Sequence, residues 1–228
     1  MTQQIALVTG GNKGIGFSIV RALCKEVKEC IVYLTARNEE RGKAAVEELK
    51  KEGLQPRFHQ LDIDSLESID RLKEFLKSTH GGLDILVNNA GVYKPNDVQA
   101  KMIIATNYTG TLNVCRALLP IIRPHGRSVE KETLIEEGWV QAAYDVSKMG
   151  VIALTKIQAA ALNSDSSKQD VLINCCCPGY VNTDMTDHKG IKTPDEGAVT
   201  PVFCVLLPAN SSEYQGNFLS DKTVVETW

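Results

Sequence analysis

The feature that most constrains the fold is a glycine-rich run at residues 9–16, Thr-Gly-Gly-Asn-Lys-Gly-Ile-Gly. It follows a short apolar segment, residues 5–8, and precedes a stretch whose apolar residues share one helical face: Ile15, Ile19, Leu23 and Val27. This order predicts a strand, a turn and a helix. Glycines let such a turn bring backbone N–H groups and the helix N-terminus close to a pyrophosphate. The run therefore predicts a dinucleotide-binding loop; its spacing is G-x-x-x-G-x-G, and a plain tight turn is the alternative.

Segments with strand and helix character alternate along the rest of the chain. We expect strands at residues 5–8, 30–36, 57–63, 83–87, 171–176 and 218–225. We expect helices at residues 15–27, 39–52, 65–80, 98–119, 142–162 and 194–207. The strands are apolar enough to be buried on both faces, which is typical of parallel sheets covered by helices. The sequence of 228 residues, with no linker, predicts an α/β fold with a single doubly wound parallel-sheet (Rossmann) domain over residues 1–228.

Charge and composition exclude several classes of function. Acidic residues outnumber basic ones, 28 to 25, so the chain lacks the positive charge expected of a protein that binds nucleic acid. No apolar run approaches the roughly 20 residues that span a bilayer, and the first residues lack the pattern of a leader peptide. The seven cysteines form no C-x-x-C pair and the four histidines are scattered, so we expect free thiols and no metal site. These features favour a cytoplasmic protein without nucleic-acid or membrane partners.

Two basic residues bear on the choice of dinucleotide. Arg37 ends the second expected strand, where an acid would bind the ribose 2′-hydroxyl and a base would accept a 2′-phosphate. Together with Lys13 it favours NADP(H), the alternative being that both are ordinary solvated charges. Polar and small residues also follow two further strands, at residues 62–63 and 88–91, where open α/β sheets bind their ligands. The asparagines among them could instead serve as caps or turn residues.

A tyrosine and a lysine lie four residues apart at the start of an expected helix. Tyr144 and Lys148 therefore share one face, where the ammonium can lower the pKa of the phenol. A tyrosine with such a pKa can pass a proton to a carbonyl oxygen while hydride arrives at carbon. The Y-x-x-x-K pattern occurs by chance in many helices, so its weight depends on the other motifs.

Five motifs, taken in order, resemble the short-chain dehydrogenase/reductase family: residues 9–16, residues 88–91, Asn107, Tyr144 with Lys148, and Pro178-Gly179. Residues 8–16, 56–63 and 176–179, with the triplet Thr183-Asp184-Met185, are most similar to its cytosolic NADPH-dependent carbonyl reductases, and the similarity covers nearly the whole chain. The resemblance implies a monomer that reduces ketones, aldehydes or quinones to alcohols. It implies that Tyr144 is the general acid, that Lys148 binds the nicotinamide ribose and lowers the tyrosine pKa, and that Asn107 holds a water in a proton relay.

The motifs and the resemblance together give a set of expected site residues. The catalytic residues are Tyr144, Lys148 and Asn107. The expected NADP(H) contacts are Gly10, Asn12, Lys13, Gly14, Ile15, Gly16, Arg37, Asp62, Ile63, Asn89, Ala90, Gly91, Tyr144, Lys148, Pro178, Gly179, Val181 and Thr183. Cys177 lies beside them as a candidate reactive thiol, with a buried apolar cysteine as the alternative.

One segment departs from the family pattern. The family has a fifth strand ending in a serine that donates to the substrate carbonyl, whereas here Gly126-Arg127 is followed by Ser-Val-Glu-Lys-Glu, too charged for a strand buried on both faces. We therefore expect no fifth strand, so that the strands at 83–87 and 171–176 either meet directly or expose their edges. Ser128 is a poor candidate for the missing donor, because it directly follows the Gly-Arg turn. An internally deleted variant, a sequence from which residues have been omitted, and an enzyme with a rearranged sheet are three open explanations. A non-catalytic or impaired NADP(H)-binding protein is the alternative function.

Overall fold

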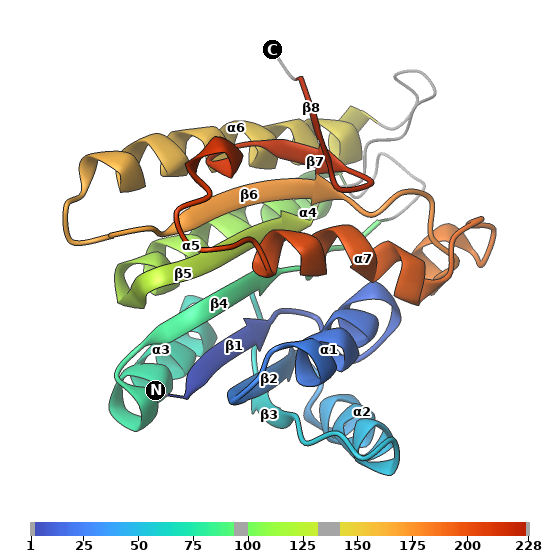
Figure 1. Cartoon of the computed structure of the whole chain (residues 1–228). Helices are drawn as coiled ribbons and strands as arrows, with labels where there is room; N and C mark the ends of the chain where they lie inside the picture. The colour runs from blue at the N-terminus through green and yellow to red at the C-terminus, as the bar shows by residue number, and fades with distance from the viewer. Residues whose placement is uncertain (1–2, 94–99, 132–141, 227–228) are drawn as a thin grey trace.

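The sheet is the centre of the computed structural model, which describes residues 3–93, 100–131 and 142–226 (Figure 1). Its strand order is β3-β2-β1-β4-β5-β6-β7-β8, with every pair parallel except β7 and β8. The strands are β1 (Gln4–Val8), β2 (Cys30–Ala36), β3 (Arg57–Gln60), β4 (Leu83–Asn88), β5 (Ile122–Lys131), β6 (Leu172–Cys177), β7 (Phe218–Ser220) and β8 (Thr223–Val225). The α-helices are α1 (Gly14–Glu26), α2 (Glu39–Lys51), α3 (Leu66–His80), α4 (Ala100–Ile104), α5 (Thr111–Leu118), α6 (Ala142–Ser164) and α7 (Pro194–Val205).

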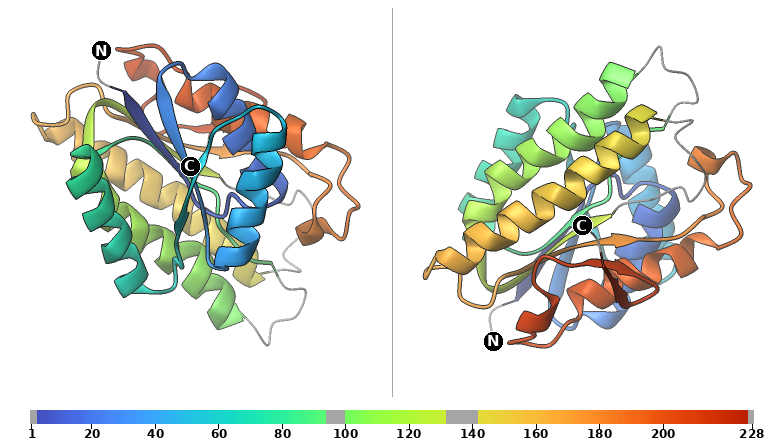
Figure 2. Two further views of the ribbon diagram at one scale, coloured as in Figure 1. Left: turned by 90° about the horizontal axis from the view of Figure 1, so that it is seen from below. Right: turned by 90° about the horizontal axis from the view of Figure 1, so that it is seen from above.

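Helices cover both faces of the sheet, as the two views of Figure 2 show. The alternation of side chains along β1 decides which residues meet which layer, because successive side chains of a strand point to opposite faces. Ala6 and Val8 join the cluster formed with α1, α2 and α7, whereas Ile5 and Leu7 join the cluster formed with α3 and α5. The two clusters confirm the expected doubly wound α/β domain. In the part of the chain that the structure describes, no helix combines the length and apolarity needed to cross a membrane.

The expectation that the chain has no fifth strand is wrong. Strand β5 pairs in parallel with β4 on one side and β6 on the other, with Val129 opposite both Val87 and Asn174. It begins irregularly: the register against β4 shifts near its start, where Pro124 has no backbone N–H to donate and His125 has a φ of 64°. Without β5, strands β4 and β6 would each leave backbone N–H and C=O groups unpaired. Segment 122–131 forms hydrogen bonds with these groups, although its side chains are polar. Strands β4 and β6 therefore neither meet nor expose an edge here.

Three other elements differ from the expected ones. The helix expected at 98–119 is described from Ala100 and contains a π-helical turn, η2 (Ala105–Gly110), before α5 and the short 3₁₀ helix η3 (Leu119–Ile121). Strand β3 ends at Gln60, three residues earlier than expected. The last expected strand, 218–225, is a hairpin of β7 and β8. Its two turn residues, Asp221 and Lys222, have φ values of 47° and 63°, which matches the two-residue turns that join antiparallel strands.

Candidate functional site

The carboxyl ends of β1 and β4 are tied together by two side chains. The Thr9 hydroxyl oxygen accepts hydrogen bonds from Asn89 N and Ala90 N at 3.0 and 2.9 Å. In return, Asn89 Nδ2 donates to Thr9 O at 2.8 Å and to Gly10 O at 3.0 Å. The expected site residues Asn89 and Ala90 thus hold the glycine-rich run against the end of β4. Neither interpretation of Asn89, as a helix cap or as a free turn residue, describes this role.

Two glycines of the run are required by close contacts. Gly10 has a φ of 64°, and a Cβ placed on it would lie 2.9 Å from Ala90 Cα. A Cβ on Gly16 would lie 2.3 Å from Asn89 Nδ2 and 2.4 Å from Gly10 O. Any side chain at either position would push the run away from β4. Gly14 and Thr183 also lie close, since a Cβ on Gly14 would be 3.3 Å from Thr183 Cγ2.

The run leaves the N-terminus of α1 open to an anion. Lys13 is the N-cap residue, its side chain makes no capping hydrogen bond, and the first turn carries no acidic residue. The first N–H groups of a helix have no partner within the helix, and the helix dipole favours negative charge there. Lys13 itself is exposed and half-buried Asn12 precedes it, whereas Ile15 is buried in the core beneath the run.

The expected contacts on the neighbouring strands are divided between surface and core. Arg37 follows the last residue of β2 and is exposed, and its carbonyl oxygen accepts from Gln60 Nε2 at 3.3 Å. Asp62 uses one carboxylate oxygen to accept from Asp64 N at 3.1 Å. Ile63 is buried and packs against Gly110, where a Cβ would lie 3.1 Å from Ile63 Cδ1.

The three expected catalytic residues come from two helical segments and meet at Gly91. Lys148 Nζ lies 5.2 Å from the centre of the Tyr144 ring, and both side chains are buried. Asn107 belongs to the π-helical turn η2, a kind of irregularity that is frequent at functional sites. A Cβ on Gly91 would lie 3.2 Å from Asn107 Oδ1 and 3.7 Å from Lys148 Nζ. The structure therefore brings Asn107, Tyr144 and Lys148 together beside the end of β4.

Asn107 is fixed by a serine that the motifs did not single out. Asn107 Nδ2 donates to Ser147 Oγ at 3.2 Å and to Val92 O at 3.0 Å, and Asn107 Oδ1 accepts from Val92 N at 2.8 Å. The Ser147 hydroxyl in turn donates to Tyr144 O at 2.6 Å. The sequence indicates Ser147 only by its position three residues after Tyr144 in the same expected helix, which places the two residues about one turn apart.

Two more side chains cover the Tyr144 hydroxyl and ring. Met185 Sδ lies 3.9 Å from the hydroxyl oxygen, within hydrogen-bonding range for sulfur. The Tyr93 ring meets the Tyr144 ring edge to face, with centres 5.3 Å apart at 81°. As a result only 4% of Tyr144 is exposed. Met185 is part of the Thr-Asp-Met triplet noted in the sequence, but nothing in the sequence placed it on the tyrosine.

The loop after β6 carries the remaining expected contacts. Gly179 has a φ of 81°, and its N–H donates to Cys177 Sγ at 3.3 Å. Pro178 is buried at the end of β6, and Val181 is buried in the core cluster that contains Ile15. Thr183 lies against Gly14, as noted above. Residues 178–183 thus lie across the glycine-rich run.

Ser128 does not occupy the place of a donor at the end of a strand. It lies within β5, opposite Leu86 and Ile173, and only 1% of it is exposed. Its hydroxyl oxygen is 3.5 Å from Glu130 Oε1, which also accepts from Asn88 Nδ2 at 2.8 Å and lies 3.3 Å from Cys115 Sγ. Ser128 is therefore part of a buried polar group beneath the site. The segment that follows β5, residues 132–141, lies outside the described residues.

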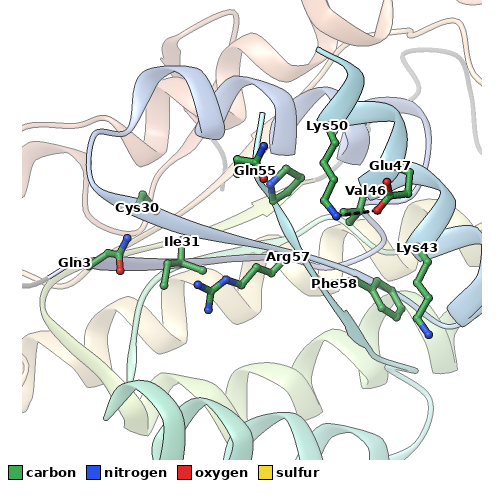
Figure 3. A pocket seen from close by; sticks show the side chains of 11 residues that line it. Gln3, Cys30, Ile31, Lys43, Val46, Glu47, Lys50, Gln55, Arg57 and Phe58 are labelled. Atoms are coloured by element: carbon green, nitrogen blue, oxygen red, sulfur yellow. Dashed lines mark hydrogen bonds and ion pairs between the residues drawn. The ribbon is translucent and has the colours of Figure 1, made fainter. Parts of the chain in front are cut away.

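A surface hollow elsewhere is unsuited to be the cofactor site (Figure 3). It is lined by residues at the amino ends of β1, β2 and β3 and by one side of α2: Gln3, Cys30, Ile31, Lys43, Val46, Glu47, Lys50, Gln55, Pro56, Arg57 and Phe58. Ligands of open α/β sheets bind beyond the carboxyl ends of the strands, where the glycine-rich run lies. One of the hollow's lysines, Lys50, is already paired with Glu47 at 2.8 Å.

The fold and the open helix N-terminus define a nucleotide-binding protein of the Rossmann type. The family model for short chain dehydrogenases matches residues 4–193, and the chain belongs to this family. It is 44% identical to NADPH carbonyl reductase 3 of Rattus norvegicus, over 99% of this chain and 98% of the relative. It is 43% identical to NADPH carbonyl reductase 1 of Homo sapiens, over 98% of each. A crystal structure of a variant actinorhodin polyketide ketoreductase with NADPH is 25% identical, covers 97% of each chain and has a TM-score of 0.83.

The alignments also bear on the length of the chain. The alignment with the rat relative extends over 274 positions, whereas the chain has 228 residues, so at least 46 positions must be gaps in this chain. Because the relative is covered almost completely, these gaps are residues that it has and this chain lacks.

Proposed function

We propose that the chain is an NADPH-dependent carbonyl reductase that converts ketones, aldehydes or quinones to alcohols. The observation that carries this proposal is that Tyr144, Lys148 and Asn107 lie together beside Gly91, in a fold whose helix α1 has an open N-terminus. The relatives named above support the choice of reaction and of cofactor. A small-molecule carbonyl compound is the substrate.

The residues present fit NADP(H). The glycines at 10 and 16 leave no room for a Cβ, so the backbone of the run can lie close to a pyrophosphate, and α1 offers its uncapped N–H groups. Lys13 and Arg37 are exposed bases on neighbouring carboxyl ends and would hold the 2′-phosphate. Asp62, Ile63, Ala90 and Gly91 would line the adenosine half, and residues 178–183 the nicotinamide half. When bound, NADPH supplies the hydride.

The side chains of the chain supply the proton. The Tyr144 hydroxyl would donate to the oxygen of the substrate carbonyl, taking the position that Met185 Sδ now occupies. The Lys148 ammonium, over the tyrosine ring, favours the phenolate that remains. The Asn107 side chain is hydrogen-bonded to Val92 and Ser147, which fixes the π-helical turn where this residue would hold the relay water.

The alternative function is NADP(H) binding without turnover, and the carbonyl reductases to which the chain is similar do not favour it. In the family pattern a serine after β5 donates to the substrate, and Ser128 is buried inside the strand instead. We propose that the positions missing relative to the carbonyl reductases lie just after β5 and include that serine. The reaction would then depend on Tyr144 alone for the hydrogen bond to the carbonyl oxygen.

We also propose that the protein works in the cytoplasm as a monomer. The described cysteines are all free thiols, which suits a reducing compartment. The names of the relatives imply small-molecule substrates, and the acidic balance of 28 to 25 gives no support for a nucleic-acid partner.

Replacing Tyr144 with phenylalanine tests the proposed function. We expect Tyr144→Phe to lower the rate of NADPH oxidation with the quinone menadione by at least about 100-fold, because general acid catalysis typically contributes that much or more. NADPH affinity, measured by fluorescence titration, should change by less than about twofold. Tyr33→Phe is the matched control, since the Tyr33 hydroxyl bonds to His80 on the opposite side of the fold. An unchanged rate would remove Tyr144 from the mechanism; a wild-type chain that binds NADPH tightly without turnover would establish the alternative function.

A further inference from the structure

A single helical turn in the loop after β6 carries two adjacent residues that occupy two parts of the proposed site. This turn is the 3₁₀ helix η4 (Asp184–Thr186). It is built as a unit, because the Thr186 hydroxyl donates to Val181 O at 2.6 Å and accepts from Thr183 N at 3.1 Å. Asp187 and His188, which follow it, have φ values of 49° and 59° and reverse the chain. Asp184 and Met185 are therefore expected to move together.

Asp184 holds the lysine that is proposed to bind the 2′-phosphate. Lys13 Nζ lies 2.5 Å from Asp184 Oδ2, and His188 Nε2 lies 3.2 Å from the other carboxylate oxygen. The hydrogen bond and charge of Lys13, with a smaller contribution from His188, lower the pKa of the Asp184 carboxyl, which is therefore ionised at neutral pH. The Lys13 and Asp184 side chains remain 63% and 60% exposed, so a dissolved anion can reach the pair.

Met185 covers the group that is proposed to protonate the substrate. Its sulfur lies 3.9 Å from the Tyr144 hydroxyl oxygen, where the sulfur accepts in place of a carbonyl oxygen. A substrate cannot hydrogen-bond to Tyr144 without displacing Met185. The same conformation of η4 therefore fills the substrate position and engages Lys13.

We propose that η4 is an autoinhibitory strap, released when the 2′-phosphate of NADPH competes with Asp184 for Lys13, so that Met185 leaves the Tyr144 hydroxyl. This inference rests on the proposed function, because it assumes that Lys13 binds the 2′-phosphate. A phosphate monoester carries up to two negative charges against one for the carboxylate, so it competes well for the lysine. NADH has no 2′-phosphate and leaves the Lys13–Asp184 pair intact. The strap thus makes substrate access depend on which cofactor is bound.

Replacing Asp184 with asparagine tests whether this carboxylate competes with the 2′-phosphate for Lys13. An exposed ion pair contributes up to about 1 kcal/mol, which corresponds to about fivefold in affinity. We therefore expect Asp184→Asn to lower the NADPH dissociation constant by about two- to fivefold while leaving that of NADH unchanged. In a Lys13→Gln background the same substitution should have no effect on either cofactor. Asp187→Asn is the matched control, because Asp187 lies in the same loop, 4.0 Å from Lys189 and away from Lys13.

The coupling between the Asp184–Lys13 pair and the Met185–Tyr144 contact is tested by measuring kcat. With menadione as substrate, Asp184→Asn should raise kcat with NADH at least twofold, since the strap is loosened without a 2′-phosphate, and leave kcat with NADPH unchanged. Met185→Ala should also raise kcat with NADH, and because the coupling between the two contacts is reciprocal, it should lower the NADPH dissociation constant while leaving that of NADH unchanged. If Asp184→Asn matches the wild type with both cofactors, or if its effect persists with Lys13→Gln, the strap is refuted. A wild-type chain that fails to bind NADPH at all would instead refute the proposed function.

Discussion

Strands β1 and β5 occupy equivalent central places in the sheet but have very different sequences. From Ile5 to Val8, β1 is apolar and buried on both faces. The buried part of β5 contains Arg127, Ser128 and Glu130, each at most 5% exposed. Strand β1 follows from its own side chains, whereas β5 lies where the neighbouring strands leave a gap. The comparison shows that backbone pairing on both sides can place a strand that its composition argues against.

The polar residues of β5 have partners supplied by the rest of the fold. The Arg127 guanidinium donates to Asp170 O and Pro208 O, both at 2.8 Å. Asn88 Nδ2 donates to Glu130 Oε1 at 2.8 Å. Buried polar groups are tolerated when they are hydrogen-bonded, and these contacts meet that condition for Arg127 and for one carboxylate oxygen of Glu130. On the β1 side, by contrast, close contacts at Gly10 and Gly16 constrain the backbone.

The largest effect is expected at the glycine-rich run. Gly16→Ala forces a Cβ to within 2.4 Å of the backbone oxygen of Gly10, which cannot give way without moving β1. We expect a loss of about 3 kcal/mol in the free energy of unfolding, the upper part of the usual range for overpacking. Urea unfolding followed by circular dichroism measures it.

Gly53→Ala provides the matched control for this substitution. Gly53 has a φ of 81° but nothing within 4 Å of its missing Cβ, so only the strained backbone costs free energy, about 1 kcal/mol. Equal losses in the two variants would contradict the close contact between the run and β4.

An intermediate effect is expected from the two buried serines near the site. Ser147→Ala removes the hydroxyl that binds Asn107 and Tyr144 O, and we expect kcat/KM for menadione to fall about tenfold as Asn107 shifts. Ser128→Ala should leave kcat/KM within about twofold, since Ser128 lies inside β5. The rate of NADPH oxidation distinguishes the two variants. A large loss with Ser128→Ala would show that Ser128 reaches the substrate and that β5 ends differently.

How far the sequence could predict the molecule depends on whether a feature is local. The glycine-rich run, the alternating elements and the Tyr144–Lys148 pair rest on neighbours in sequence, and the fold expected from them is confirmed. Strand β5 was missed because its identity depends on β4 and β6, which lie far away in the chain. Met185 was missed for the same reason: only the folded loop brings it to Tyr144, 41 residues earlier.

Titratable groups in the two regions shift in opposite directions. Near the start of β5, burial would raise the pKa of the Asp170 carboxyl, but His125, Asn210 N and Arg127 together lower it. Its contribution to stability is therefore present above the pKa of the unfolded state and lost as the pH falls. On the β1 side, burial raises the pKa of the Cys24 thiol to about 11. Burial, with smaller contributions from Asp84 and Cys24, raises that of Cys30 to about 12.

A pH-dependent effect follows from those two thiols. In the unfolded chain they ionise near pH 9.0, while in the folded chain they stay protonated up to pH 11 to 12. Their contribution is fully present below pH 9 and declines as the pH rises from there, because the unfolded state releases its protons first. The double variant Cys24→Ala/Cys30→Ala should therefore lose less stability than the wild type between pH 8 and pH 10 in urea unfolding. Parallel losses in the two proteins would show that both thiols ionise as freely in the folded chain as in the unfolded one.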